Sequence, residues 1–290
     1  MGDMAVNKIA IIGGGTMGSG IALTAAMHGI DAVVTDINED QLARAAAYHA
    51  KQFARSVSKE RMTQEEADVA TTHLSYVTAM TDASDADWVV EAATENIDIK
   101  KSIFMQMFET FGKDVVLATN TSSISITDLA SVIPDAADRV IGMHFFNPVP
   151  VMKLVEVIKG EETSSETTAS TLALSEQMGK IPVPANDKAG FVSNRVLMPM
   201  INEAFHTWAD GVAEPEDIDL IMKLGCAFPM GPLRLADYIG LDVCKDIMMV
   251  MYNGLDENPK YLPSAKLVEL VDQGHLGDKS GRGVYKYDKG

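Results

Sequence analysis

The sequence predicts an α/β domain with a mostly parallel sheet, followed by an all-α domain, and three observations support this. A short apolar run, Lys8 to Ile12, leads into a glycine-rich turn and a helix, which is the start of a βαβ unit. Apolar segments of strand length recur as far as Ile181 to Pro184, whereas beyond about Ala189 the apolar spacing is helical. At 290 residues two domains are expected, and we place them at residues 1–186 and 187–290.

The first unit has the pattern of a dinucleotide-binding, Rossmann-type fold. Its turn carries three spaced glycines, Gly13, Gly15 and Gly18. The first permits a tight turn, the second lets backbone approach a pyrophosphate, and the third allows close packing of the following helix. Asp36 ends the next predicted strand, where it can accept hydrogen bonds from the adenine ribose, and no Arg follows it in residues 37–39. NAD is therefore expected rather than NADP. The alternative is that the glycines serve only as turns and Asp36 is a solvated residue at a strand end.

Two further strands are predicted to end in polar sequence. Residues 87–93 and 114–118 are mostly apolar, and the second run leads into a turn rich in hydroxyl groups. Because the carboxyl ends of parallel strands share one edge of a sheet, ligand contacts belong there. The polar residues at this edge are Glu95, Lys100, Ser122 and Ser123. The serines have a structural alternative, because residues 125–128 form a capping box for a following helix.

The stretch from Ile141 to Ile158 places one imidazole and one carboxylate in otherwise apolar, strand-like sequence. An unpaired ionised carboxylate in a buried strand is costly, so we expect Glu156 to have a partner. His144 and Glu156 are therefore candidates for acid–base chemistry. The alternative is that a structural Arg or backbone amides satisfy Glu156, while a backbone carbonyl satisfies His144.

Charge and composition exclude several classes of partner. The net charge of −17, from 24 basic and 41 acidic residues, argues against binding to nucleic acid or to an anionic membrane surface. An anionic ligand must then be held locally, and the second half of a predicted helix from Glu39 to about Met62 carries the cations Lys51, Arg55, Lys59 and Arg61. These cations either meet such a ligand or form a solvated helix face.

Neither a membrane span nor a secretion signal is evident, so a cytoplasmic protein is expected. The two cysteines, Cys226 and Cys244, are expected to be reduced and buried, and no metal site is predicted. In the second domain, helices are predicted at residues 194–208, 215–225, 241–252 and 265–272. The methionines of residues 248–251 are expected in the core or in a subunit interface.

Motifs along nearly the whole chain resemble those of the L-3-hydroxyacyl-CoA dehydrogenase family. They read IIGGGTMGSGIA, VVEAATEN, NTSSISIT, HFFNPVPVMKLVEVI, GKIPV, GFVSNR, PMGP and GRGVYKY. The resemblance implies an NAD-dependent oxidoreductase that interconverts 3-hydroxyacyl-CoA and 3-ketoacyl-CoA, with 3-hydroxybutyryl-CoA and acetoacetyl-CoA as the expected pair. It also implies a homodimer formed through the helical domain.

The resemblance assigns roles to the catalytic residues. His144 would exchange the proton of the 3-hydroxyl group, and Glu156 would orient the imidazole. Ser122 would hydrogen-bond the reacting oxygen, and Asn194 would position the acyl group. The spacing between Ser122 and His144 is one residue longer than is usual in the family, so Ser123 stays open as an alternative.

The resemblance further implies cofactor contacts from both domains, at Gly13, Gly15, Thr16, Met17, Gly18, Asp36, Glu95, Lys100, Asn147 and Lys279. Lys59 would meet the anionic coenzyme A tail, whereas Gln52 replaces a serine that contacts coenzyme A in some relatives. Two other functions are considered: a related beta-hydroxyacid dehydrogenase acting on a free acid, and an NAD-binding protein without catalysis.

Overall fold

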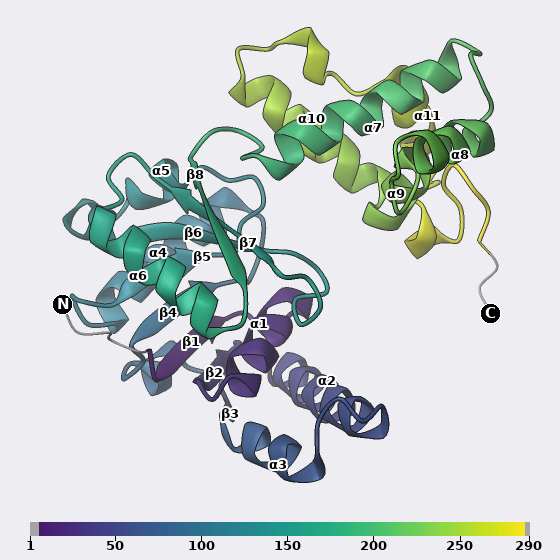
Figure 1. Cartoon of the computed structure of the whole chain (residues 1–290). Helices are drawn as coiled ribbons and strands as arrows, with labels where there is room; N and C mark the ends of the chain where they lie inside the picture. The colour runs from purple at the N-terminus through teal and green to yellow at the C-terminus, as the bar shows by residue number, and fades with distance from the viewer. Residues whose placement is uncertain (1–5, 288–290) are drawn as a thin grey trace. The chain divides into compact units, whose positions relative to one another are not determined.

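The computed structural model describes residues 6–287 of the chain (Figure 1). The chain divides into two compact units, and the division falls after Asp187. We call the part up to Asp187 unit 1 and the part from Lys188 unit 2. Each unit has its own buried apolar core.

Unit 1 contains an eight-stranded sheet in the order β3-β2-β1-β4-β5-β6-β7-β8. Neighbouring strands are parallel except β6 and β7, which pair antiparallel. The strands are β1 Lys8–Ile12, β2 Asp31–Thr35, β3 Leu74–Val77, β4 Trp88–Glu91, β5 Val116–Thr119, β6 Val140–Phe145, β7 Leu154–Lys159 and β8 Ile181–Asn186. This sheet and the helical unit that follows confirm the predicted fold class.

The central strands are buried along nearly their whole length, because helices cover the sheet on both faces. Since β1, β4, β5 and β6 run parallel, their carboxyl ends lie at one edge of the sheet. The strand order reverses direction at β1, which has β2 on one side and β4 on the other. In open sheets of this kind, the crevice at that reversal is where dinucleotides bind.

The helices of unit 1 connect these strands (Figure 1). They are α1 Thr16–Met27, α2 Glu39–Ser58, α3 Gln64–Thr72, α4 Ile97–Thr110, α5 Ile126–Ala130 and α6 Ser165–Gln177, with the short turns η1 Met80–Ala83 and η2 Pro134–Arg139. The side chain of Asn38 caps α2, that of Asn96 caps α4, and that of Ser125 caps α5. Polar residues after β2, β4 and β5 thus serve first to start the next helix.

Unit 2 is helical in its described part, apart from isolated bridges near residues 277–286. Its helices are α7 Ser193–Ala209, α8 Pro215–Gly225, α9 Pro232–Ile239, α10 Leu241–Gly254 and α11 Ala265–Asp272, with η3 Pro259–Tyr261 and η4 Asp278–Ser280. Met248 and Met251 are buried in the core of this unit.

Several details differ from the sequence prediction. The helix expected to reach Met62 ends at Ser58, and a second helix, α3, begins after a capping box between Thr63 and Glu66. The burial predicted for Cys226 is wrong, because it follows the end of α8 and is exposed; Cys244 is buried. Within residues 6–287, no helix combines the length and the apolar character needed to cross a membrane.

Candidate active site

The glycine turn after β1 has the backbone geometry that its residues predict. Gly13 has a φ of 111°, and a Cβ placed there would lie 2.6 Å from the Cα of Ala93. A Cβ on Gly18 would lie 1.9 Å from the carbonyl oxygen of Gly13. Any side chain at either position would therefore force the turn away from β4 or away from α1.

The start of α1 is open to a ligand. A Cβ on Gly15 would meet no atom of the described chain within 4 Å, and no side chain among residues 6–287 caps this helix. Thr16 and Met17 form its first turn, so their amides join those of the glycine turn. Backbone N–H groups without a protein cap, at the positive end of a helix dipole, suit a pyrophosphate. The residues present thus fit a dinucleotide.

Asp36 follows β2, and two backbone amides hold its carboxylate. Its Oδ2 accepts a hydrogen bond from the amide of Gly14 at 2.8 Å, and its Oδ1 accepts one from the amide of Asn38 at 2.9 Å. The carboxylate is therefore fixed beside the glycine turn with lone pairs left for a ribose diol. A 2′-phosphate at this place would meet a negative charge, which agrees with the expectation of NAD.

A buried ion pair underlies the end of β4. Glu91 and Lys100 are 0% and 1% exposed, and the Lys100 ammonium donates to Glu91 Oε2. The hydroxyl of Thr119 donates to the same oxygen at 2.6 Å, and the amide of Ala93 donates to Oε1 at 2.8 Å. Lys100, predicted as a cofactor contact, is thus held inside the protein by an acid that the prediction missed. The sequence signal for Glu91 was available, because it too interrupts an apolar strand.

Glu95 organises the turn after β5. Its Oε1 accepts hydrogen bonds from the Thr121 hydroxyl at 2.7 Å and the Ser122 amide at 2.8 Å. The hydroxyls of Ser122 and Ser123 donate to the same oxygen at 3.0 Å each. Both serines therefore lie at the carboxyl edge of the sheet beside Glu95, whose other oxygen is 3.8 Å from Lys100 Nζ.

The imidazole and the carboxylate of the apolar stretch meet directly. His144 on β6 and Glu156 on β7 are cross-strand partners in the antiparallel pair, and His144 Nδ1 lies 2.7 Å from Glu156 Oε2. The two residues are 7% and 4% exposed. The ring of Phe146, which the sequence analysis did not single out, lies 4.5 Å from the imidazole, measured between centroids. A carboxylate on one ring nitrogen fixes the orientation of the imidazole and directs the other nitrogen for exchange of a proton.

The remaining predicted residues lie at separate places in the two units. Asn147 is exposed in the loop after β6, close in sequence to His144. Asn194 is 8% exposed at the start of α7 in unit 2. Lys279, also in unit 2, donates a hydrogen bond to Asp242 at 2.6 Å.

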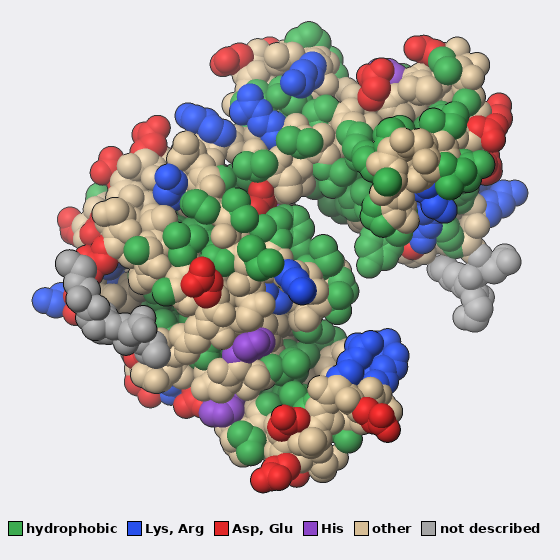
Figure 2. Space-filling model, in the orientation of Figure 1, with side chains coloured by type: hydrophobic (Ala, Val, Ile, Leu, Met, Phe, Trp, Pro, Cys, Tyr) green, Lys and Arg blue, Asp and Glu red, His purple; other side chains and the backbone are tan. Residues whose placement is uncertain are grey.

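Lys and Arg side chains gather over α2 (Figure 2). The exposed cations on this helix and the turn that follows are Arg44 and the four predicted residues Lys51, Arg55, Lys59 and Arg61. Lys59 stands at the C-cap of α2, where a cation also stabilises the helix dipole. In a chain with a net charge of −17, this group is a local attractor for an anion.

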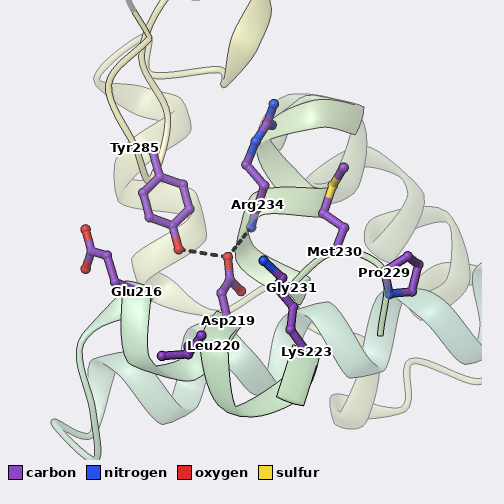
Figure 3. A pocket seen from close by; sticks show the side chains of 9 residues that line it. All are labelled: Glu216, Asp219, Leu220, Lys223, Pro229, Met230, Gly231, Arg234 and Tyr285. Carbon is purple, nitrogen blue, oxygen red and sulfur yellow. Dashed lines mark hydrogen bonds between the residues drawn. The ribbon is translucent and has the colours of Figure 1, made fainter. Parts of the chain in front are cut away.

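A cavity of about 440 Å³ in unit 2 lies between α8, α9 and the C-terminal segment (Figure 3). The Asp219 carboxylate in its wall accepts hydrogen bonds from the amide of Arg234 at 2.8 Å and from the hydroxyl of Tyr285 at 2.7 Å. These bonds cap α9 and fasten the C-terminal segment. The cavity includes none of the predicted site residues in its described lining. Among residues 6–287, no group of three or more His, Cys, Asp or Glu side chains is arranged to hold a metal ion.

Comparison with known proteins agrees with this geometry. The model of the 3-hydroxyacyl-CoA dehydrogenase NAD-binding domain matches residues 8–188, and that of the 3-hydroxyacyl-CoA dehydrogenase C-terminal domain matches residues 190–287. A probable 3-hydroxybutyryl-CoA dehydrogenase of Bacillus subtilis is 47% identical over 286 residues, which cover 99% of each chain. The human mitochondrial hydroxyacyl-coenzyme A dehydrogenase is 41% identical over 97% of this chain and 91% of that protein.

A solved structure shows the same architecture. The crystal structure of (S)-3-hydroxybutyryl-CoA dehydrogenase from Ralstonia eutropha superposes with a TM-score of 0.96 at 47% identity, and the match covers 98% of this chain and 100% of that one. The resemblance inferred from the motifs is confirmed, and the matched NAD-binding domain indicates NAD as the cofactor. The chain belongs to the 3-hydroxyacyl-CoA dehydrogenase family.

Proposed function

We propose that this protein interconverts (S)-3-hydroxyacyl-CoA and 3-ketoacyl-CoA with NAD, and that 3-hydroxybutyryl-CoA and acetoacetyl-CoA are its substrate pair. The observation that carries the proposal is the direct 2.7 Å contact between His144 Nδ1 and Glu156 Oε2 at the edge of the sheet that also bears the glycine turn. The names of the relatives in Bacillus subtilis and Ralstonia eutropha support the choice of substrate.

His144 acts as the general acid and base. With the Nδ1 proton donated to Glu156, Nε2 accepts the proton of the 3-hydroxyl group during oxidation and returns it during reduction. Bound NAD supplies the hydride acceptor for C3, and NADH supplies the donor. Glu156 stabilises the imidazolium that forms and keeps the ring in one orientation, as a buried carboxylate does for a catalytic histidine.

The serines and Asn194 position the acyl group. Ser122 hydrogen-bonds the reacting oxygen, and Ser123 is the alternative because both hydroxyls lie at 3.0 Å from Glu95. Asn194 contacts the acyl portion from unit 2. Positioning of the acyl group contributes more to catalysis than the strength of any single hydrogen bond, since hydride transfer requires C3 to approach the nicotinamide ring closely.

Exposed cations bind the coenzyme A tail, whereas backbone amides and Asp36 bind NAD. Lys59, with the other exposed cations of α2, attracts the anionic coenzyme A tail. The helix N-terminus at Thr16 binds the pyrophosphate, and Asp36 binds the adenine ribose. The further NAD contacts are Glu95, Asn147 and Lys279. Lys100 was predicted as a contact too, but its buried pair with Glu91 supports an indirect role beside the cofactor.

We also propose a cytoplasmic homodimer formed through unit 2. On α8, Ile221 and Leu224 are 61% and 76% exposed, and together with Leu220 they leave an apolar helix face uncovered in the single chain. Apolar surface of this kind favours a protein interface. Sedimentation equilibrium of the parent protein and of Leu224→Glu tests this, because the charged substitution should shift the dimer toward monomer.

A substrate comparison tests the proposed function. The ratio kcat/KM is measured for acetoacetyl-CoA, for longer 3-ketoacyl-CoA esters and for free acetoacetate, each with NADH and with NADPH. We expect acetoacetyl-CoA with NADH to be preferred over free acetoacetate. Equal or better activity on the free acid would favour the alternative dehydrogenase class, and no oxidation of NADH by any ketone would favour a non-catalytic NAD-binding protein.

A further inference from the structure

Lys180 is a buried cation that the proposed mechanism does not use. It follows α6, is 7% exposed, and donates hydrogen bonds to the carbonyl oxygens of Val149 at 2.5 Å and Met152 at 3.0 Å. Both of these acceptors are neutral backbone groups rather than carboxylates. Lysine is almost never this buried without a paired charge, and burial lowers the pKa of Lys180. Because burial of an unpaired ammonium group costs free energy, we expect this lysine to have a specific role.

The two carbonyls belong to one loop, residues 146–153, which joins β6 to β7. The loop turns tightly after Pro148, whose carbonyl oxygen accepts a hydrogen bond from the amide of Met152 at 3.0 Å. Its two ends continue into the strands that carry His144 and Glu156. A group that fixes this loop therefore acts next to the proposed acid–base pair.

The same loop also touches the helix of the cofactor turn. Val149 is 2% exposed, and a Cβ added to Gly20 on α1 would lie 2.9 Å from the Val149 Cβ. Val149 thus packs against α1 where only glycine leaves room for it. Asn147, two residues earlier, is exposed in the same loop. The loop is held on one side by the Lys180 ammonium and on the other by α1, with Asn147 at its surface.

We propose that Lys180 is a positioning residue for NAD, because its ammonium holds loop 146–153 against α1 and so places Asn147 at the cofactor. Only the contact between Asn147 and NAD rests on the proposed function. Lysine suits this task since its three donors, at the end of a long stem, can bind two carbonyl oxygens at once. A neutral apolar side chain would leave both carbonyls buried without donors.

The test compares Lys180→Met with Lys153→Met, which removes an exposed lysine from the same loop. The dissociation constant of NADH is measured by fluorescence titration, and KM is measured for NADH and for acetoacetyl-CoA. We expect Lys180→Met to raise both the dissociation constant and the KM for NADH on the order of tenfold, because the loop that contacts the cofactor would be displaced. The KM for acetoacetyl-CoA should change by less than about twofold. Lys153→Met should match the parent, and Lys180→Arg should restore most of the affinity.

A double variant separates positioning from mere stabilisation. If Lys180 acts through Asn147, the double variant of Lys180→Met and Asn147→Ala should bind NADH at most about twofold more weakly than Asn147→Ala alone. Fully additive effects, or unchanged NADH affinity in folded Lys180→Met, would overturn the inference. If Lys180→Met does not fold, Lys180→Gln gives the same comparison. NADH titration does not require turnover. A parent protein that is inactive on acetoacetyl-CoA would refute the proposed function, but the titration would still test the role of Lys180.

Discussion

Loss of either partner of the buried Lys100–Glu91 pair should destabilise unit 1 strongly, and by different amounts. Removing one member of a buried pair costs about 3–5 kcal/mol, because the other charge stays buried. After Lys100→Met, Glu91 keeps donors from Thr119 at 2.6 Å and Ala93 at 2.8 Å, so we expect about 3 kcal/mol, the lower end of the range. After Glu91→Leu, Lys100 keeps the Thr119 oxygen at 3.3 Å, with Glu95 at 3.8 Å, so we expect about 4–5 kcal/mol.

The double variant tests whether the loss comes from the charge that is left unpaired. With Lys100→Met and Glu91→Leu together, no charge remains in the buried site, so the cost should fall to about 1 kcal/mol. Unfolding in urea is followed by the fluorescence of Trp88, which is buried in β4 of unit 1, in a Trp208→Phe background that silences unit 2.

Each single variant should lower the urea midpoint by about 1.5–2.5 M, given a slope of about 2 kcal/mol/M for a unit of this size. Lys113→Met, which removes an exposed lysine from unit 1, should leave the free energy of unfolding within about 0.5 kcal/mol of the parent. Single variants that match this control, or a double variant as unstable as the sum of the two, would refute the reasoning.

Three further predictions concern ligand selection and pH. Lys59→Ala should raise KM for acetoacetyl-CoA about threefold and leave KM for NADH unchanged, because an exposed charge contact contributes modestly; no change would argue against the coenzyme A contact. Asp36→Ala should reduce the preference for NADH over NADPH in kcat/KM by about tenfold or more, whereas equal use of both cofactors by the parent would contradict the role of Asp36. His49 is 1% exposed between Ser19 and Tyr76, and burial lowers its pKa. The unfolded chain therefore binds the proton more readily, so unit 1 should lose stability as the pH falls below about 6.5, and His49→Phe should show a smaller loss in urea titrations from pH 7 to pH 5.

The sequence predicted the elements whose signals are local and strong. The strand Lys8–Ile12 and the helices Pro215–Gly225 and Ala265–Asp272 have the predicted bounds, because an apolar run, an N-terminal proline and helical spacing mark them. The strand β3 was missed, since its four residues are only partly buried and show no clear alternation. Its place in the sheet depends on pairing with β2, a contact distant in sequence.

Site residues, too, were predicted where the signal is local and missed where it depends on packing. A polar group in an apolar strand was a sufficient signal for His144 and Glu156, and the same signal would have found Glu91. It could not show that Glu91 and Lys100 neutralise each other, since nine residues and a turn separate them. Likewise, nothing in the local sequence around Lys180 indicates that its ammonium reaches the carbonyls of Val149 and Met152, because only the packing of α6 and β8 brings it there.

The acid–base role of His144, oriented by Glu156, is tested most directly by steady-state reduction of acetoacetyl-CoA in His144→Gln and Glu156→Gln, at saturating NADH. We predict that kcat falls about 10²–10⁴-fold in His144→Gln, the usual contribution of a general acid–base group, and by a smaller factor in Glu156→Gln. The dissociation constant of NADH should stay within about twofold of the parent in both, because neither side chain is a proposed cofactor contact. A His144→Gln enzyme that retains kcat within tenfold of the parent would contradict the mechanism.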